Sequence, residues 1–187
     1  MLNLDKNKFY LLACSYGPDS MALFNMLLEE GYKFSIAHVN YNLRTESKSE
    51  TIALSKYCDE KKIFLFKLEV DEDLGKTNIE AKCRKIRYDF FKDIYQICQA
   101  DALLIAHNQD DLIETYYLQK KRKNLVNYYG IKQNSVLFDM NVIRPLLDFK
   151  KSELTNYCLS HNVPFAIDSS NLLDCYQRNI IRHSIVE

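Results

Sequence analysis

The amino-acid sequence predicts an α/β fold with a three-layer, doubly wound and mainly parallel sheet of the Rossmann-like type. Short apolar runs of strand length alternate along the chain with longer segments whose apolar residues recur at helical spacing. These runs are apolar throughout, which is typical of strands buried on both faces of a parallel sheet. Because crossovers between parallel strands are almost always right-handed, we expect helices to cover both faces.

The individual elements follow from the same two patterns. Apolar runs predict buried strands at 9–14, 34–39, 63–70 and 102–106. Helical spacing predicts helices at 19–30, 47–61, 78–98, 110–120 and 150–161, and Gly31 ends the first of them. A weaker extended stretch covers 136–138 and 142–143. No linker, internal repeat or low-complexity tract interrupts this order, so residues 1–187 are predicted to form a single domain.

The composition excludes several classes of protein. Lys and Arg total 25, and so do Asp and Glu, so the basic residues must gather locally if nucleic acid is to bind. No apolar run approaches the roughly 18 residues of a membrane span, and the first residues lack a signal-peptide core. The six cysteines include no C-x-x-C pair, which is typical of reduced thiols and argues against a zinc ribbon or an iron–sulfur site. We therefore expect a cytoplasmic protein that does not associate with a membrane.

A turn of small residues follows the first predicted strand, with the sequence Ser15-Tyr16-Gly17-Pro18-Asp19-Ser20. Ligands of open α/β sheets bind beyond the carboxyl ends of the strands. A turn that leads into a helix N-terminus there presents backbone N–H groups and the positive end of the helix dipole to an anion. The turn matches neither a Walker A loop nor the G-x-G-x-x-G pattern. From these residues alone, a simple turn capped by Ser15 or Asp19 is an equally good interpretation.

An acidic segment follows the fourth predicted strand. On a helix, Asp110 and Glu114 are four residues apart and Asp111 and Glu114 are three apart, so their carboxylates share one face of the first turn. Acidic residues also favour helix N-termini without binding anything. Three acids beside His107 nevertheless exceed what capping requires, and the cluster suits Mg²⁺ or a cationic substrate group.

A third polar segment, 168–171, precedes Arg178 and Arg182 and is a weak signal by itself. Taken together, however, the segments resemble the N-terminal catalytic domain of the tRNA(Ile)-lysidine synthetase family, within the PP-loop ATP pyrophosphatase superfamily. Six family motifs occur in the family's order: S-G-G-x-D-S is similar to 15–20, H-V-D-H-x-L-R to 38–44, E-x-x-A-R-x-x-R-Y to 80–88, H-x-x-D-D-x-x-E-T to 107–115, R-P-L-L to 144–147, and D-x-S-N…R-N-x-x-R to 168–182.

The resemblance implies an adenine nucleotide alpha hydrolase (PP-loop) fold and a ligase that forms a C–N bond. Such an enzyme uses ATP to adenylate the wobble cytidine of tRNA(Ile) and releases pyrophosphate. The ε-amine of free L-lysine then displaces AMP. The implied ATP-binding residues are Ser15, Tyr16, Gly17, Pro18, Asp19, Ser20 and His38.

The resemblance also implies roles for the other motif residues. Catalysis would involve Asp19, Asp110 and Glu114, and Mg²⁺ would bind Asp19 and Asp111. Lysine would be held by Arg84, Arg87, His107, Asp110, Asp111 and Glu114. Contacts with tRNA are expected from Lys120, Lys121, Arg122, Lys123, Arg178 and Arg182, although a basic run at a helix C-terminus is also favoured by the dipole alone.

Several features depart from the family pattern or leave its use open. Tyr16 stands where the family usually has Gly, at a cost of about 1 kcal/mol if the backbone there needs a positive φ. Pro18 has no N–H to donate to phosphate. Six of the seven arginines lie within the motifs, as forks for phosphate or carboxylate, although Arg144 and Arg182 suit a structural tie to backbone carbonyls equally well. The family usually continues into further tRNA-binding domains, which 1–187 lack, so we expect a reduced enzyme or a part of one.

Two other functions stay open on this reading. A related PP-loop enzyme that thiolates tRNA would need a sulfur-carrying cysteine, commonly one of a pair, and the absence of C-x-x-C counts against it. A non-catalytic nucleotide- or tRNA-binding module would explain an altered loop at Tyr16. The intact carboxylates at Asp19, Asp110, Asp111 and Glu114 count against such decay.

Overall fold

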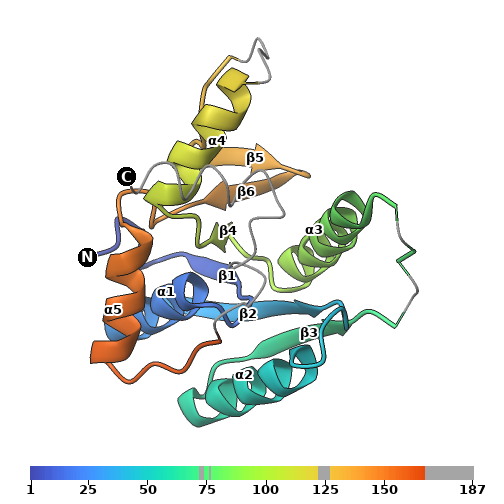
Figure 1. Cartoon of the computed structure of the whole chain (residues 1–187). Coiled ribbons are helices and arrows are strands. Elements are labelled where there is room, and N and C mark those ends of the chain that lie inside the picture. The colour runs from blue at the N-terminus through green and yellow to red at the C-terminus, as the bar shows by residue number, and fades with distance from the viewer. Residues whose placement is uncertain (72–73, 76, 122–126, 167–187) are drawn as a thin grey trace.

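The computed structural model describes residues 1–71, 74–75, 77–121 and 127–166, and these residues form a sheet of six strands with helices on both faces (Figure 1). The strand order is β3-β2-β1-β4-β6-β5. The strands are β1 (Phe9–Ala13), β2 (Lys33–Asn40), β3 (Leu65–Glu69), β4 (Ala102–Ile105), β5 (Asn134–Leu137) and β6 (Met140–Ile143). The helices are α1 (Pro18–Glu29), α2 (Ser47–Lys61), α3 (Ile79–Ile97), α4 (Gln109–Lys121) and α5 (Lys151–Ser160).

All neighbouring strands pair in parallel except β5 and β6, which confirms the predicted fold class. Alternation along β1 explains the three layers, because successive side chains of a strand point to opposite faces. Tyr10 and Leu12 pack into a core with α1, α2 and α5, whereas Leu11 packs into a second core with α3. Both cores are apolar, as the uninterrupted apolar runs predict.

The weaker extended stretch forms the hairpin β5–β6 at one edge of the sheet. Its two turn residues, Phe138 and Asp139, have φ angles of 51° and 63°, which is the conformation of a tight two-residue hairpin turn. Two contacts with α3 hold this turn: Phe138 stacks on Tyr88 with ring centroids 4.8 Å apart, and Lys92 forms a 2.6 Å ion pair with Asp139. The hairpin is therefore docked onto the helix that carries the predicted substrate arginines.

Little of helix α4 is buried. Only Glu114 and Leu118 are buried among its described residues, and its C-terminal half projects away from the sheet (Figure 1). Within the described part of the chain, no helix has the length and apolar character that a membrane crossing requires.

Candidate active site

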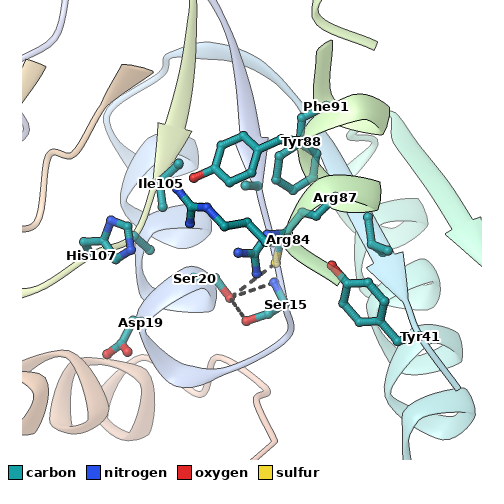
Figure 2. Close-up of a pocket in the computed structure, with 14 residues that line it drawn as sticks. Ser15, Asp19, Ser20, Tyr41, Arg84, Arg87, Tyr88, Phe91, Ile105 and His107 are labelled. Carbon is teal, nitrogen blue, oxygen red and sulfur yellow. Dashed lines mark hydrogen bonds between the residues drawn. The ribbon is translucent and has the colours of Figure 1, made fainter. Parts of the chain in front are cut away.

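The main pocket lies where the strand order reverses, between β1 and β4, at the carboxyl edge of the sheet. This is the place at which open α/β sheets bind their ligands. The pocket has a volume of about 230 Å³ and is enclosed by the ends of three strands, the start of α1 and one face of α3 (Figure 2). Its polar and charged lining residues are Ser15, Asp19, Ser20, Tyr41, Arg84, Arg87, Tyr88 and His107.

The β1–α1 turn supplies the floor of this pocket. The Ser20 hydroxyl accepts a hydrogen bond from the backbone N–H of Ser15 at 3.3 Å and donates one to the Gly17 carbonyl at 3.0 Å. Gly17 is the N-cap of α1 and Pro18 occupies its first turn, where a missing N–H costs nothing. The turn therefore points a helix N-terminus and two serine hydroxyls into the cavity, which is an arrangement that binds anions.

Tyr16 adopts the positive φ that its sequence position suggested, with a value of 65°. This conformation is strained for a residue other than glycine. The side chain is buried in the core beneath the turn, and the carbonyl of Tyr16 accepts a hydrogen bond from the Ala166 N–H at 2.9 Å. Packing and this hydrogen bond stabilise a backbone that the tyrosine itself disfavours.

Helix α3 supplies a cationic wall opposite the turn. The guanidinium of Arg84 lies 4.7 Å from the centre of the Tyr88 ring, and that of Arg87 lies 5.6 Å from it. Both arginines project into the space between α3 and the β1–α1 turn (Figure 2). The aromatic face attracts the cations and fixes where their forks can point. The arginines were predicted as site residues but Tyr88 was not, although it is the last residue of the same motif.

Tyr41 is a second aromatic lining residue that was not predicted from the sequence. Its hydroxyl donates a hydrogen bond to the Cys83 carbonyl at 2.9 Å, which joins the end of β2 to α3. Burial raises the pKa of Tyr41 to about 12, so the phenol is neutral at physiological pH. Tyr41 also separates the main pocket from a second hollow of about 250 Å³ that Arg44 and Glu50 line.

His38 borders this second hollow but its ring is engaged elsewhere. The Nδ1 atom lies 2.8 Å from the Cys14 carbonyl and Nε2 lies 3.0 Å from the Thr51 hydroxyl. Since a carbonyl only accepts, Nδ1 carries a proton and donates it. Burial lowers the pKa of His38, which favours the neutral ring. The ring therefore ties β1 to α2, and a direct role in ATP binding stays a prediction.

His107 lies at the other end of the pocket and is oriented by Arg144. The Arg144 Nε–H donates to His107 Nδ1 at 3.1 Å, which leaves the imidazole proton on Nε2. Arg144 is buried, and it also donates to the Lys132 carbonyl at 2.8 Å and to the Ser135 hydroxyl at 2.9 Å. The interpretation of Arg144 as a structural tie is thus confirmed. Through its hydrogen bond with His107, Arg144 also contacts a residue that lines the main pocket.

The acidic segment is placed differently from the expectation of one shared carboxylate face. Asp110 Oδ2 accepts a hydrogen bond from the Lys151 N–H at 2.9 Å, at the start of α5. Asp111 Oδ2 accepts one from the Asn108 N–H at 3.1 Å, and Glu114 is only 3% exposed. None of these three described carboxylates lines the main pocket. Their predicted roles toward lysine and Mg²⁺ remain predictions.

Asp19 is the carboxylate that does line the main pocket. Within the described residues, no group of three or more His, Cys, Asp or Glu side chains could hold a metal ion by itself. Mg²⁺ in nucleotide sites is usually bound by one or two carboxylates together with phosphate oxygens. Asp19, beside an anion-binding helix N-terminus, fits that manner of binding.

The predicted tRNA contacts are only partly described. Lys120 and Lys121 end α4 on the surface, and the Lys120 ammonium lies 5.0 Å from the centre of the Tyr116 ring. Arg122, Lys123, Arg178 and Arg182 lie outside the described residues.

The thiols bear on the alternative of tRNA thiolation. Burial raises the pKa of Cys14, Cys83 and Cys98, and it raises that of Cys58 to about 12. A thiol with a raised pKa is a poor nucleophile, because the thiolate is the reactive form. The described cysteines therefore resemble structural thiols, and Cys175 lies outside the described residues.

Comparison with known proteins points to the same family. The chain is 42% identical to the tRNA(Ile)-lysidine synthase of Mycoplasma mycoides, across 100% of the chain and 48% of the relative. It is 39% identical to the enzyme of the same name from Ureaplasma parvum, across 99% of the chain and 56% of the relative. The chain thus spans about half the length of these relatives.

A solved structure of similar fold is the U34-tRNA thiolase NcsA from Methanococcus maripaludis with its 4Fe-4S cluster. It superposes with a TM-score of 0.73 over 97% of this chain and 66% of its own, at 17% identity. At that identity the likeness concerns the fold alone. The PP-loop domain family matches residues 1–187. The sequence match agrees with the strand order, with the β1–α1 turn and with the arginines of α3. The chain belongs to the PP-loop domain family.

Proposed function

We propose that this chain is the ATP-using domain of an enzyme that attaches lysine to the wobble cytidine of tRNA(Ile), and that it works in the cytoplasm. The observation that carries the proposal is the 42% identity, over the whole chain, to a protein named tRNA(Ile)-lysidine synthase. The buried thiols with raised pKa values make thiolation the weaker alternative.

The first half-reaction needs a site for the triphosphate of ATP. The N-terminus of α1 and the Ser15 hydroxyl would bind the pyrophosphate that leaves, because both can donate to an anion. The Ser20 hydroxyl would join them by turning its proton from the Gly17 carbonyl to a phosphate oxygen. Mg²⁺ would be held by Asp19 with phosphate oxygens, and when bound it neutralises the charge that builds on those oxygens.

Two arginines are available for the other anionic groups of the reaction. Arg84 and Arg87 point into the pocket with their planes restrained by Tyr88, and a guanidinium fork can hold a carboxylate or a phosphate through two hydrogen bonds. We assign them to the lysine carboxylate. His107 would donate its Nε2 proton toward the same cavity.

The second half-reaction needs a group that holds the lysine ammonium and then accepts a proton. Glu114 and Asp110 are our candidates, since a carboxylate can do both in turn. Asp110 already accepts a hydrogen bond through Oδ2, so its other oxygen would make the contact with lysine. Lys120 to Lys123 would contact the tRNA backbone, together with Arg178 and Arg182.

The decisive experiment is incorporation of labelled lysine into a tRNA(Ile) transcript that carries a CAU anticodon. We expect incorporation that depends on ATP and releases one AMP per lysine. The same transcript with a UAU anticodon is the matched control, because it lacks the cytidine. Release of AMP without lysine incorporation, or incorporation into the control, would contradict the proposal.

A further inference from the structure

A groove lined by tyrosines lies between α4 and residues 128–129. Its lining residues are Leu112, Ile113, Tyr116, Tyr117, Tyr128 and Tyr129, and its volume is about 550 Å³. Three of these rings are well exposed: 50% of Tyr117, 47% of Tyr128 and 39% of Tyr129. Contiguous exposed aromatic surface of this kind usually marks an interaction site.

The two walls of the groove come from separate segments that are fixed to each other. Gly130 has a φ of 87°, and a Cβ there would lie 2.7 Å from Leu112 Cδ1, so the backbone conformation and the close crossing over α4 both favour glycine. The Gly130 N–H donates to Gln119 Oε1 at 2.7 Å. The crossing brings Tyr129 to Tyr116, with ring centroids 6.0 Å apart. The groove is thus a built feature rather than a chance gap.

Cations border the tyrosine-lined part of the groove, while Asp111 and Glu114 flank its other end at Leu112 and Ile113. The Lys120 ammonium lies 5.0 Å from the Tyr116 ring centre, and that of Lys132 lies 5.4 Å from the Tyr128 ring centre. Residues 115–121 and 127–133 contain no Asp or Glu. Flat aromatic faces between lysines fit an unpaired nucleic-acid strand, whose bases stack and whose phosphates are anionic.

The groove is also linked mechanically to the main pocket. Arg144 donates to the Lys132 carbonyl, at the end of the Tyr128–Tyr129 wall, and to His107 in the pocket. Helix α4 itself starts beside that pocket and carries the other wall. A strand that places one base in the pocket would find the tyrosines along the helix that leads away from it.

We infer that this tyrosine groove binds unpaired nucleotides of the RNA substrate by stacking. The inference rests on the proposed function for the identity of the RNA, but not for the stacking itself. The alternative occupant is a protein, either a second copy of this chain or a different one. In that case RNA would not compete with the protein for the groove.

The test measures binding of a fluorescein-labelled anticodon stem–loop RNA to the 187-residue chain by fluorescence anisotropy. We expect Tyr117→Leu and Tyr128→Leu each to weaken binding about fivefold to tenfold, since a base stacked on an aromatic ring is lost. Tyr128→Phe should restore binding because the ring stays. Phe64→Leu is the matched control, since Phe64 is an exposed aromatic residue directly before β3, far along the chain from the groove.

Two further readouts separate stacking from charge. Neither leucine substitution should change how steeply binding falls with salt, whereas Lys132→Gln should reduce that slope by about one. A blunt RNA duplex of equal length should bind no differently to the tyrosine variants, since it offers no unpaired base. The chain has no tryptophan but has 13 tyrosines, so the stacking signal is the part of the tyrosine-fluorescence quenching by unlabelled stem–loop that Tyr128→Leu removes.

Unchanged stem–loop affinity in the Tyr117→Leu/Tyr128→Leu double variant would overturn the inference, as would absence of stem–loop binding to the wild-type chain. Loss of a dimer in the double variant, seen by light scattering without a change in RNA affinity, would identify a second copy as the occupant instead. Lysine incorporation is measured in parallel. If the tyrosine substitutions weaken RNA binding but the wild-type chain incorporates no lysine, the inference about the groove is supported and the proposed function is contradicted.

Discussion

The β1–α1 turn and the β4–α4 turn occupy equivalent places on either side of the switch point, yet they use their polar residues in opposite ways. In the first turn, Ser15, Asp19 and Ser20 all line the main pocket. In the second, Asp110 and Asp111 accept hydrogen bonds from backbone N–H groups, and Glu114 is buried. The first turn directs three polar side chains into the pocket, whereas the second directs only His107 there and uses two carboxylates to hold helices in place.

This difference shows that motif residues at a sheet's carboxyl edge can have two duties. Asp110 joins α4 to the start of α5, while Asp111 and Asn108 exchange hydrogen bonds at the start of α4. A helix N-terminus stabilises a carboxylate whether or not a substrate is present. Substitutions in the two turns can separate these duties.

Substitution of Asp19 by Asn should nearly abolish the first turn's chemistry. We expect AMP and pyrophosphate formation to fall about 100-fold or more, because the neutral amide cannot hold Mg²⁺ beside the phosphates. The melting temperature should stay within about 3 °C of the wild type, since the shape of the side chain is kept. Asp59→Asn, on the exposed surface of α2, is the control. Wild-type turnover in Asp19→Asn would show that Asp19 does not hold Mg²⁺.

Glu114→Gln tests whether the buried carboxylate of the second turn serves lysine. We expect the KM for lysine to rise about tenfold while the KM for ATP stays within about twofold, since only the amine needs this negative charge. An adenylated tRNA intermediate should accumulate in rapid-quench experiments. An equal loss of affinity for both substrates would instead place Glu114 near the phosphates or give it a purely structural role.

The sequence predicted the fold well because its signals are local. The helix that Gly31 ends and the apolar strand at 34–39 both appear where the spacing indicates, as α1 and β2. The hairpin was only a weak extended stretch, because its turn residues Phe138 and Asp139 are not the Asn-Gly pair that marks such turns. Contacts with α3, which no local pattern reveals, hold this turn in place.

The site was predicted less completely because its geometry depends on tertiary contacts. The motifs identified Ser15, Asp19 and Arg84, which the pocket brings together. Spacing along a helix could not reveal that the Asp110 carboxylate meets the Lys151 N–H, since that partner lies 41 residues away. Nor could it reveal the ring of Tyr88 beneath the arginines, because aromatic residues on a helix face are more often core.

Tyr16→Gly tests the strain stored in the first turn. Glycine would relieve about 1–2 kcal/mol of backbone strain at φ 65°. It would also remove a buried aromatic side chain, a loss of about 3–5 kcal/mol. We therefore expect the free energy of unfolding to fall by about 2 kcal/mol in urea titrations. Tyr16→Phe should retain nearly all of the wild-type free energy of unfolding. A Tyr16→Gly variant that is more stable than the wild type would show that strain outweighs packing.

Asp110 allows the structural duty of the second turn to be measured alone. Asp110→Ala removes the acceptor for the Lys151 N–H and should lower the free energy of unfolding by about 1–2 kcal/mol. Asp110→Asn keeps an acceptor oxygen and should lose less than half of that. Because the Asn variant is neutral, a fall in its lysine affinity would report the charge of Asp110. If the Ala variant is as stable as the wild type, the contact with Lys151 has no structural value.

The smallest effect connects the first turn to α5 through Cys158, whose thiol donates to the Pro18 carbonyl at 3.4 Å. Burial, and then the charge of Asp19, raise the pKa of Cys158 from 9.0 to about 11. The folded state therefore holds this proton more tightly than the unfolded state, so the resulting stability is complete below pH 9 and is lost as the pH rises toward 11.

We expect Cys158→Ala to flatten this part of the curve of unfolding free energy against pH, relative to the wild type. The wild-type curve should also flatten slightly in Asp19→Asn, because removing the carboxylate charge lowers the pKa of Cys158 toward its usual value. Asp110→Asn is the matched comparison from the second turn, since Asp110 is not among the groups that shift this thiol. If Asp110→Asn and Asp19→Asn flatten the curve equally, Cys158 does not sense the first turn in particular, and the charge of Asp19 is screened from it by solvent.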